Sequence, residues 1–130
     1  MSDNKSQLTQ EILETYDKIC DAFSRLDIDV VLRYFSDSPE MTKISRGQKL
    51  RGKKELAEYW GRRLGQASDL RITIENVEVF PIDAGHVWAT ADESVAIAGQ
   101  VQKAVVSNIF VRSGAGWKIL LDHTTYLNSD

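Results

Sequence analysis

Apolar residues recur at steps of three and four along the first part of the chain, over residues 8–26. This spacing is typical of an amphipathic α-helix of about five turns with a single apolar stripe. A stripe of this length predicts that the helix covers a broad apolar surface. The residues on the stripe are Leu8, Ile12, Tyr16, Ile19, Phe23 and Leu26.

Two shorter helices are predicted next. Asp27 can cap the first of them, and Pro39 is expected to halt it. Residues 41–50 have a mixed pattern, typical of a short strand or an extended loop, and they lead to Gly52. The third helix follows, with Gly65 as a plausible stop. The apolar faces are Ile28, Val31, Leu32 and Phe35 in the first of these helices, and Leu56, Trp60 and Leu64 in the second.

Beyond residue 70 the apolar period becomes two, which is typical of β-strands. In the first strand the apolar residues change parity between Ile74 and Val77. An extra residue near Glu75 or Asn76 would explain the change, so we expect a β-bulge that bends the strand there. A bent strand is what a curved sheet requires.

Three further strands are predicted over residues 86–98, 101–112 and 117–127, joined by tight turns. Three helices followed by a meander of long strands predict an α+β fold: a cone-shaped, curved antiparallel sheet with the helices on its concave face. The length suits one domain over residues 1–130. Some strands, such as residues 104–106 and 119–121, are apolar on both faces, so the convex face is expected to meet a partner.

Composition excludes several partner classes. The formal net charge is -3, from 16 basic and 19 acidic residues, and offers no footprint for nucleic acid. No segment approaches the roughly 20 apolar residues of a membrane span, and the first eleven residues are too polar for a signal sequence. We therefore expect a cytoplasmic protein without nucleic-acid or membrane partners. The single cysteine, Cys20, is read as a structural thiol.

Residues 107–126, SNIFVRSGAGWKILLDHTTY, read as two strands joined by a glycine turn at Gly114 and Gly116. This block resembles the last hairpin of the nuclear transport factor two-like superfamily, especially its SnoaL-like and ketosteroid-isomerase-like members. The resemblance implies the same cone fold and a homodimer formed through the convex sheet face. It does not select a reaction, because this superfamily contains isomerases, dehydratases, hydrolases and non-catalytic modules.

Asp92 is one candidate catalytic base. It belongs to a polar stripe on a predicted central strand, which faces solvent, a dimer interface or a pocket. If the stripe lines a cavity, burial would raise the pKa of Asp92 and suit it to proton transfer. The residues of this stripe are Trp88, Thr90, Asp92 and Ser94, and the opposite face carries Val87, Ala89, Ala91, Val95 and Ile97.

His123 is the second candidate. Asp122 and His123 are neighbours on a strand, so their side chains point to opposite faces and at most one can enter the concave pocket. The resemblance places His123 at the tip of the last strand. There it would either line the pocket, where an imidazole suits acid/base chemistry, or form a hydrogen bond near the strand end.

The remaining pocket candidates come from the neighbouring strand and from the helices. Asn108 could donate a hydrogen bond to a substrate carbonyl or bind backbone, and Phe110 lies on the same side of that strand. The helices should supply aromatic residues that either roof the pocket or belong to the core. The full set of pocket candidates is Tyr16, Tyr34, Trp60, Trp88, Asn108 and Phe110.

Basic residues gather before the third helix, and they would attract an anionic ligand or form a solvated surface. No metal-ligand cluster and no phosphate-binding glycine loop is found, so no metal or cofactor is expected. The sequence thus favours a pocket for a small organic molecule, with cofactor-free acid/base chemistry of the isomerase, dehydratase or hydrolase type. The alternative is a non-catalytic ligand-sensing or oligomerisation module resembling the association domain of calmodulin-dependent kinases. The basic residues are Lys43, Arg46, Lys49, Arg51, Lys53 and Lys54.

Overall fold

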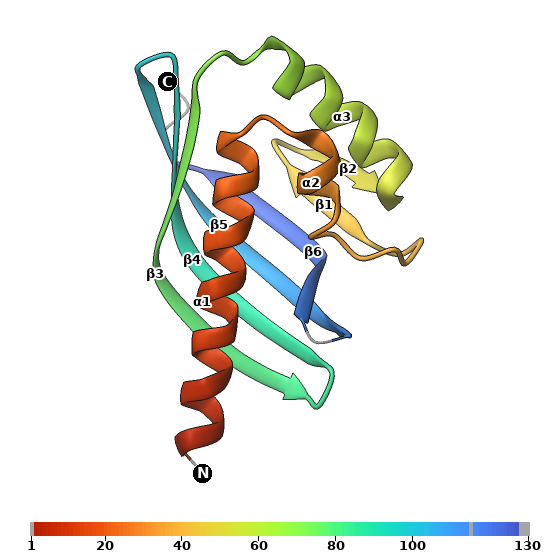
Figure 1. Ribbon diagram of the computed structural model, residues 1–130, viewed down its shortest axis with the longest axis vertical. Coiled ribbons are helices and arrows are strands. Elements are labelled where there is room, and N and C mark those ends of the chain that lie inside the picture. Colours follow the sequence, from red (N-terminus) through yellow and green to blue (C-terminus); the bar gives the residue numbers. More distant parts are fainter. Residues whose placement is uncertain (1, 115, 128–130) are drawn as a thin grey trace.

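A computed structural model describes residues 2–114 and 116–127 of the chain. The ends of the expected 1–130 domain, residue 1 and residues 128–130, lie outside these ranges, as does Ala115 of the expected glycine turn. Within them, three helices and six strands follow one another in the order α1, α2, β1, β2, α3, β3, β4, β5, β6 (Figure 1). No described helix has the length and apolar character needed to cross a membrane.

The three predicted helices are present as α1 (Ser2–Ser24), α2 (Ile28–Leu32) and α3 (Gly52–Gln66). The expected cap of α2 is confirmed, because Asp27 Oδ1 accepts hydrogen bonds from the N–H groups of Asp29 and Val30, at 3.1 and 3.3 Å. Two strands, β1 (Thr42–Ser45) and β2 (Gln48–Arg51), form a hairpin in the segment that the sequence left undecided.

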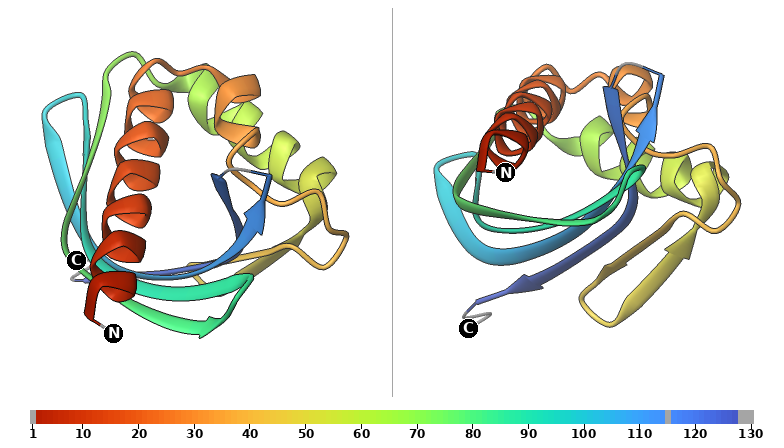
Figure 2. Two further views of the ribbon diagram at one scale, coloured as in Figure 1. Left: turned by 60° about the horizontal axis from the view of Figure 1, so that its bottom comes forward. Right: turned by 90° about the horizontal axis from the view of Figure 1, so that it is seen from below.

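The long strands are β3 (Leu70–Asp83), β4 (His86–Ile97), β5 (Gln100–Ser113) and β6 (Gly116–Tyr126). They form one six-stranded sheet in the order β2-β1-β6-β5-β4-β3. The pairing of β1 with β6 is parallel, which the sequence pattern did not indicate, and the other pairings are antiparallel. Figure 2 shows that the sheet curves around α1. The predicted α+β cone fold is therefore confirmed.

Two irregularities bend the sheet and change which side chains face inward. The expected bulge in β3 is confirmed: the register shifts between Glu75 and Glu78, and Asn76 has a φ of 55°. A second shift, which the sequence did not reveal, lies in β6. There Ile109 pairs with Leu121 but Phe110 pairs with Ile119, so Leu120 is an extra residue.

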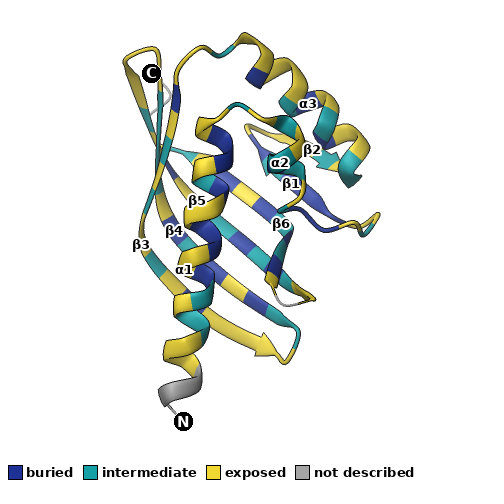
Figure 3. Ribbon diagram, viewed as in Figure 1, coloured by how far each residue is buried: buried dark blue, intermediate teal, exposed yellow. Residues whose placement is uncertain are grey.

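The core lies between the helices and the concave face. Figure 3 shows buried positions on the side of α1 that faces the sheet and, in alternation, along the strands behind it. Phe35, Phe110 and Met41 are among the largest fully buried side chains. Tyr16 of α1 packs edge-on against Phe110 of β5, with ring centroids 5.4 Å apart. The helices therefore close one side of the sheet, as predicted, and leave the convex side open.

Candidate functional site

A cavity of about 330 Å³ lies between the helices and the concave face of the sheet. Side chains of α1, α3 and all strands except β2 line it, so it is enclosed by elements from both halves of the chain. Its volume lies at the lower end of the range typical of small-molecule sites. Most of the lining is apolar, with a few ionisable groups, and these groups determine what the cavity can do.

Glu93 is a carboxylate on an otherwise apolar wall. It lies on β4 between Ala91 and Val95, on the inward-facing parity, and it makes no hydrogen bond within the described residues. Burial raises the pKa of Glu93 from 4.5 to about 7, and the negative charge of Asp122 adds to this effect. Lys43 offsets part of the shift. A carboxyl group with this pKa exchanges its proton readily near neutral pH.

Asp122 and Lys43 form a buried ion pair at one side of the cavity. Lys43 Nζ donates to Asp122 Oδ2 at 3.1 Å, and the two side chains are only 5% and 12% exposed. Burial alone would lower the pKa of Lys43, but the charge of Asp122 and this hydrogen bond outweigh it and raise that pKa. Lys43 therefore stays protonated, and its ammonium group also lies 5.2 Å from the ring centroid of Trp60.

Asn108 connects the ion pair to α1. Its Nδ2 donates to Asp122 Oδ1 at 3.2 Å and to the backbone oxygen of Leu121 at 3.3 Å, while its Oδ1 accepts from Tyr16 at 2.6 Å. Thr124 also donates to Asp122 Oδ1, at 3.2 Å. The amide donors of Asn108 are thus already engaged, and its role is to hold Asp122 and Tyr16 in place.

Besides Glu93, other polar groups of the cavity wall have no hydrogen-bond partner among the described residues. Trp60 Nε1 is buried without an acceptor, which is costly unless a ligand or water supplies one. The hydroxyl group of Tyr126 also makes no hydrogen bond there, and burial raises its pKa. The indole N–H is therefore a buried donor left without an acceptor beside the cavity.

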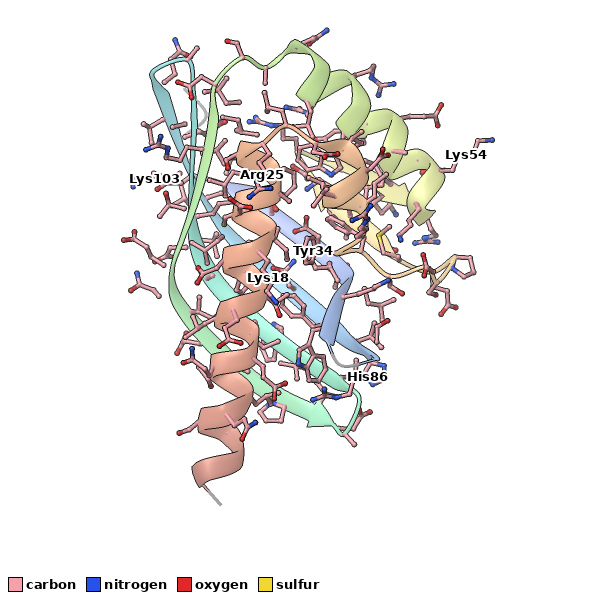
Figure 4. The ribbon with its side chains drawn as sticks, in the orientation of Figure 1. Lys18, Arg25, Tyr34, Lys54, His86 and Lys103 are labelled. Carbon is pink, nitrogen blue, oxygen red and sulfur yellow. The ribbon has the colours of Figure 1, made fainter. Side chains whose placement is uncertain are left out.

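Three of the pocket residues proposed from the sequence, Tyr16, Trp60 and Asn108, line the cavity. Two others lie elsewhere. Phe110 is fully buried in the core and is not part of the cavity wall, and Tyr34 is half-buried beside β6, where its backbone oxygen accepts from Ile119 at 2.7 Å (Figure 4).

The remaining three proposed residues face outward. Trp88 is 43% exposed and packs against Phe80 on the convex face, with ring centroids 4.9 Å apart. Asp92 is exposed and accepts a hydrogen bond from Asn76 Nδ2 at 2.7 Å. His123 is exposed as well. The polar stripe on β4 thus belongs to the convex face, and neither proposed base lines the cavity.

The carboxylates inside the cavity are the sequence neighbours of the proposed bases. On β4 the sequence pattern predicts the correct alternation, but the predicted site does not include Glu93, the one acid on the apolar side of this strand. On β6 the extra residue Leu120 reverses the parity, so Asp122 follows Trp117 and Ile119 inward and His123 turns outward. An isolated charge within an apolar face was the signal available for Glu93. No comparable signal marked the bulge.

Cys20 also lines the cavity, and burial raises its pKa to about 12, so it remains a thiol at neutral pH and is a poor nucleophile. Among the described residues no group of three or more His, Cys, Asp or Glu side chains could hold a metal ion. The chemistry available to the cavity is thus that of Glu93, the Lys43–Asp122 pair and the free indole donor.

Comparison with known proteins agrees with this architecture. A family model described as the SnoaL-like domain matches residues 12–127. The chain belongs to the SnoaL-like family. This SnoaL-like domain has the fold of the nuclear transport factor two-like superfamily, and no curated protein matches its sequence.

Solved structures similar to the SnoaL-like domain carry different descriptions. One is a putative dehydratase of the NTF2-like family from Streptomyces avermitilis, with a TM-score of 0.84 and 15% identity, covering 96% of this chain and 99% of that one. Another is a putative calcium/calmodulin-dependent protein kinase type II association domain from Thiobacillus denitrificans, with a TM-score of 0.76 and 22% identity over 88% and 93% of the two chains. At these identities the likeness establishes the fold alone.

A third similar structure is a nuclear transport factor two-like superfamily protein from Salmonella enterica, with a TM-score of 0.82 and 20% identity. The match covers 97% of this chain and 96% of that chain. The SnoaL-like domain is therefore a cone domain whose specificity must be argued from its own cavity.

Replacing Lys43 by Met should destabilise the protein by about 3–5 kcal/mol, because Asp122 would remain as a buried carboxylate without its cation. The measurement is urea denaturation. The double variant Lys43→Met/Asp122→Asn should lose less stability than the two single changes summed. Lys54 points away from α3 into solvent (Figure 4), so Lys54→Met is the matched control and should change stability by less than about 0.5 kcal/mol. A Lys43→Met variant as stable as this control would contradict the buried pair.

Proposed function

We propose that this domain binds a small carbonyl-bearing organic molecule in its cavity and transfers a proton to and from it, with Glu93 as the general base. The observation that supports this proposal is the placement of one carboxyl group, with a pKa of about 7, on the apolar cavity wall. Because this pKa lies near neutral pH, Glu93 combines a useful ionised fraction with enough basicity to accept a proton.

Other groups of the cavity wall can stabilise the charge that such a reaction creates. Trp60 Nε1 is a buried donor without a partner in the described part of the chain, and the ammonium group of Lys43 lies against the same indole ring. Donors held in place before the reaction stabilise a developing oxyanion most effectively. Asn108, the donor expected from the sequence, has no free amide hydrogen for this role.

The proposed step breaks a C–H bond next to the substrate carbonyl. The proton moves to a Glu93 carboxylate oxygen, and the C–H electron pair forms the enolate, whose oxygen receives hydrogen bonds from Trp60 and Lys43. Where a C=C bond adjoins the deprotonated carbon, the enolate extends into a dienolate, and return of the proton to its far carbon shifts the double bond and gives an isomer. Loss of a hydroxyl group from the adjacent carbon, protonated by the Glu93 carboxylic acid, gives a dehydration. Neither outcome requires a cofactor.

Asp92 or His123 would serve as this base only if it reached the cavity. Both side chains lie on the convex face, separated from the cavity by the sheet itself. Asp92 therefore provides a matched control, because it is a carboxylate adjacent to Glu93 in sequence and on the opposite side of the same strand.

Glu93→Gln should abolish proton transfer. Exchange of the protons next to the carbonyl can be followed by NMR in heavy water, using a panel of small neutral and acidic ketones. For a ketone that the wild type exchanges, Glu93→Gln should reduce the rate by about 100-fold or more, while Asp92→Asn leaves it unchanged. The wild-type rate should rise with pH and level off above about pH 7, as the carboxyl group of Glu93 ionises.

Equal exchange by wild type and Glu93→Gln would refute Glu93 as the base. Ligand binding without exchange would favour the competing function, a non-catalytic ligand-sensing module. The similarity in fold to a kinase association domain keeps an oligomerisation module among the alternatives.

We also propose a cytoplasmic location, which suits a chain whose single cysteine lines a cavity instead of forming a disulfide.

We further propose that two copies of the chain pack through the convex face. Apolar side chains on neighbouring strands form a continuous row there, and no element among the described residues covers this side of the sheet. Exposed rows of this kind are typical of interfaces. The row consists of Phe80, Trp88, Ile109 and Leu121, of which Phe80 and Trp88 are 36% and 43% exposed.

Trp88→Asp should convert the dimer into a monomer, because the substitution would place a charge in the centre of an apolar interface. Light scattering coupled to size-exclusion chromatography measures the molar mass directly. Lys54→Asp, on the outer side of α3, should leave the dimer intact. A wild-type protein that is monomeric at all concentrations would reject this interface.

A further inference from the structure

The charged side chains that line the cavity carry an excess of positive charge. Three cations, Lys43, Arg46 and Arg63, face two carboxylates, Glu93 and Asp122. Lys43 and Asp122 neutralise each other in the buried pair. Two arginines therefore remain against Glu93, which leaves the cavity positive even when Glu93 is ionised. A cavity with apolar walls concentrates such an excess charge and attracts the opposite sign.

Arg46 is held at the edge of the cavity with most of its donors free. It lies in the β1–β2 turn, where Arg46 and Gly47 have φ values of 53° and 78°, as a two-residue hairpin turn of type I′ requires. Its guanidinium group stacks on the ring of Tyr126, with Cζ 4.0 Å from the centroid. One Nη2 hydrogen bond of 2.8 Å reaches Gln102. No carboxylate pairs with Arg46 within the described residues.

Arg63 is arranged in a similar way on the helical side. It lies on α3, one turn beyond Tyr59, and its Cζ is 4.8 Å from the centroid of that ring. It has no carboxylate partner in the described part of the chain either. Stacking on an aromatic face orients a guanidinium group and leaves its N–H edge free, which is the geometry that binds a carboxylate through two hydrogen bonds.

Both arginines are exposed while the ionisable groups deeper in the cavity are buried or half-buried, so the two guanidinium groups occupy its mouth. Much of the remaining wall is apolar, including Ile72 and Ile74 of β3 and Val95 of β4. A ligand that suits these groups has an anionic group for the arginines, an apolar middle, and a carbonyl oxygen as the acceptor for Trp60 Nε1.

We propose that the ligand is a small organic acid whose carboxylate binds Arg46 and Arg63 at the mouth of the cavity, while its carbonyl end reaches Glu93 and Trp60. The inference rests on the proposed function for the site of reaction, and it adds the chemical class of the substrate. Orientation follows from the same contacts: the carboxylate is kept away from Glu93, where two negative charges would repel, and the neutral carbonyl end lies beside the base.

A matched pair of probes tests the inference. para-Acetylbenzoate carries a carboxylate, an aromatic ring and a methyl ketone in that order, and para-acetylbenzamide has the same shape without the charge. We expect wild-type protein to bind the acid about tenfold or more tightly than the amide, measured by isothermal titration calorimetry. Arg46→Gln and Arg63→Gln should each reduce this preference several-fold, mainly by weakening binding of the acid.

The controls are neighbouring cations that do not line the cavity. Arg62 precedes Arg63 on the exposed surface of α3, and Lys49 lies on β2 of the hairpin that carries Arg46. Arg62→Gln and Lys49→Gln remove the same net charge and should preserve the preference for the acid. Thermal unfolding of each variant should match the wild type, since all four side chains are exposed.

The outcomes separate this inference from the proposed function. Equal affinity for acid and amide, or an equal loss in the control variants, would overturn the arginine site and leave the cavity proposal standing. Preference for the acid without exchange of the protons next to its ketone would support the arginine site and reject the enzymatic proposal. Failure of the wild type to bind either probe at millimolar concentration would contradict both.

Discussion

The alternation of side chains along β4 and β6 is the constraint on which the rest of the site depends. Each strand presents successive residues to opposite faces, so the sheet that separates Glu93 from Asp92 also separates the cavity from solvent. On β6 the extra residue Leu120 changes the parity, and Asp122 then meets Lys43 of β1. The parallel pairing of β1 with β6 brings these two residues into register as Cα partners. Without the bulge in β6, a sequence neighbour of Asp122 would take its inward-facing position, and Lys43 would lose its counter-ion.

Holding Glu93 in an apolar wall costs stability, and the cost depends on pH. The folded-state pKa of about 7 lies above the ordinary value of 4.5, so the unfolded chain ionises first as pH rises. The free energy of unfolding therefore falls between these two values, by roughly 3 kcal/mol in total, and then levels off. A group that only stabilised the fold would not be expected at such a position. The Lys43–Asp122 pair differs from Glu93, because each charge faces an opposite charge and the two groups are hydrogen-bonded. Asp122 also accepts a hydrogen bond from Asn108, which in turn accepts one from Tyr16, so these contacts connect the sheet to α1.

Local patterns in the sequence predicted the helices, the cap at Asp27, the bulge near Asn76 and the helix-covered face, because each follows from short-range periodicity or turn chemistry. The site was predicted less completely. Tyr16, Trp60 and Asn108 could be placed near the cavity, since each lies on an element whose face the pattern determined. Asp122 could not, because the bulge at Leu120 falls in a run of three aliphatic residues that fits either parity. The roles of Arg46 and Arg63 depend on contacts between segments distant in sequence, with Tyr126 for the first and with the cavity as a whole for the second.

The account depends most on Glu93 being a buried carboxyl group that faces the cavity. An NMR titration of its side-chain carboxyl carbon, assigned by comparison with the Glu93→Gln variant, measures that property directly. We predict a midpoint of about 7, since burial and the charge of Asp122 both oppose ionisation. A midpoint near the ordinary value of 4.5 would show a solvated carboxylate, and it would contradict both the inward placement of Glu93 and its role as the base.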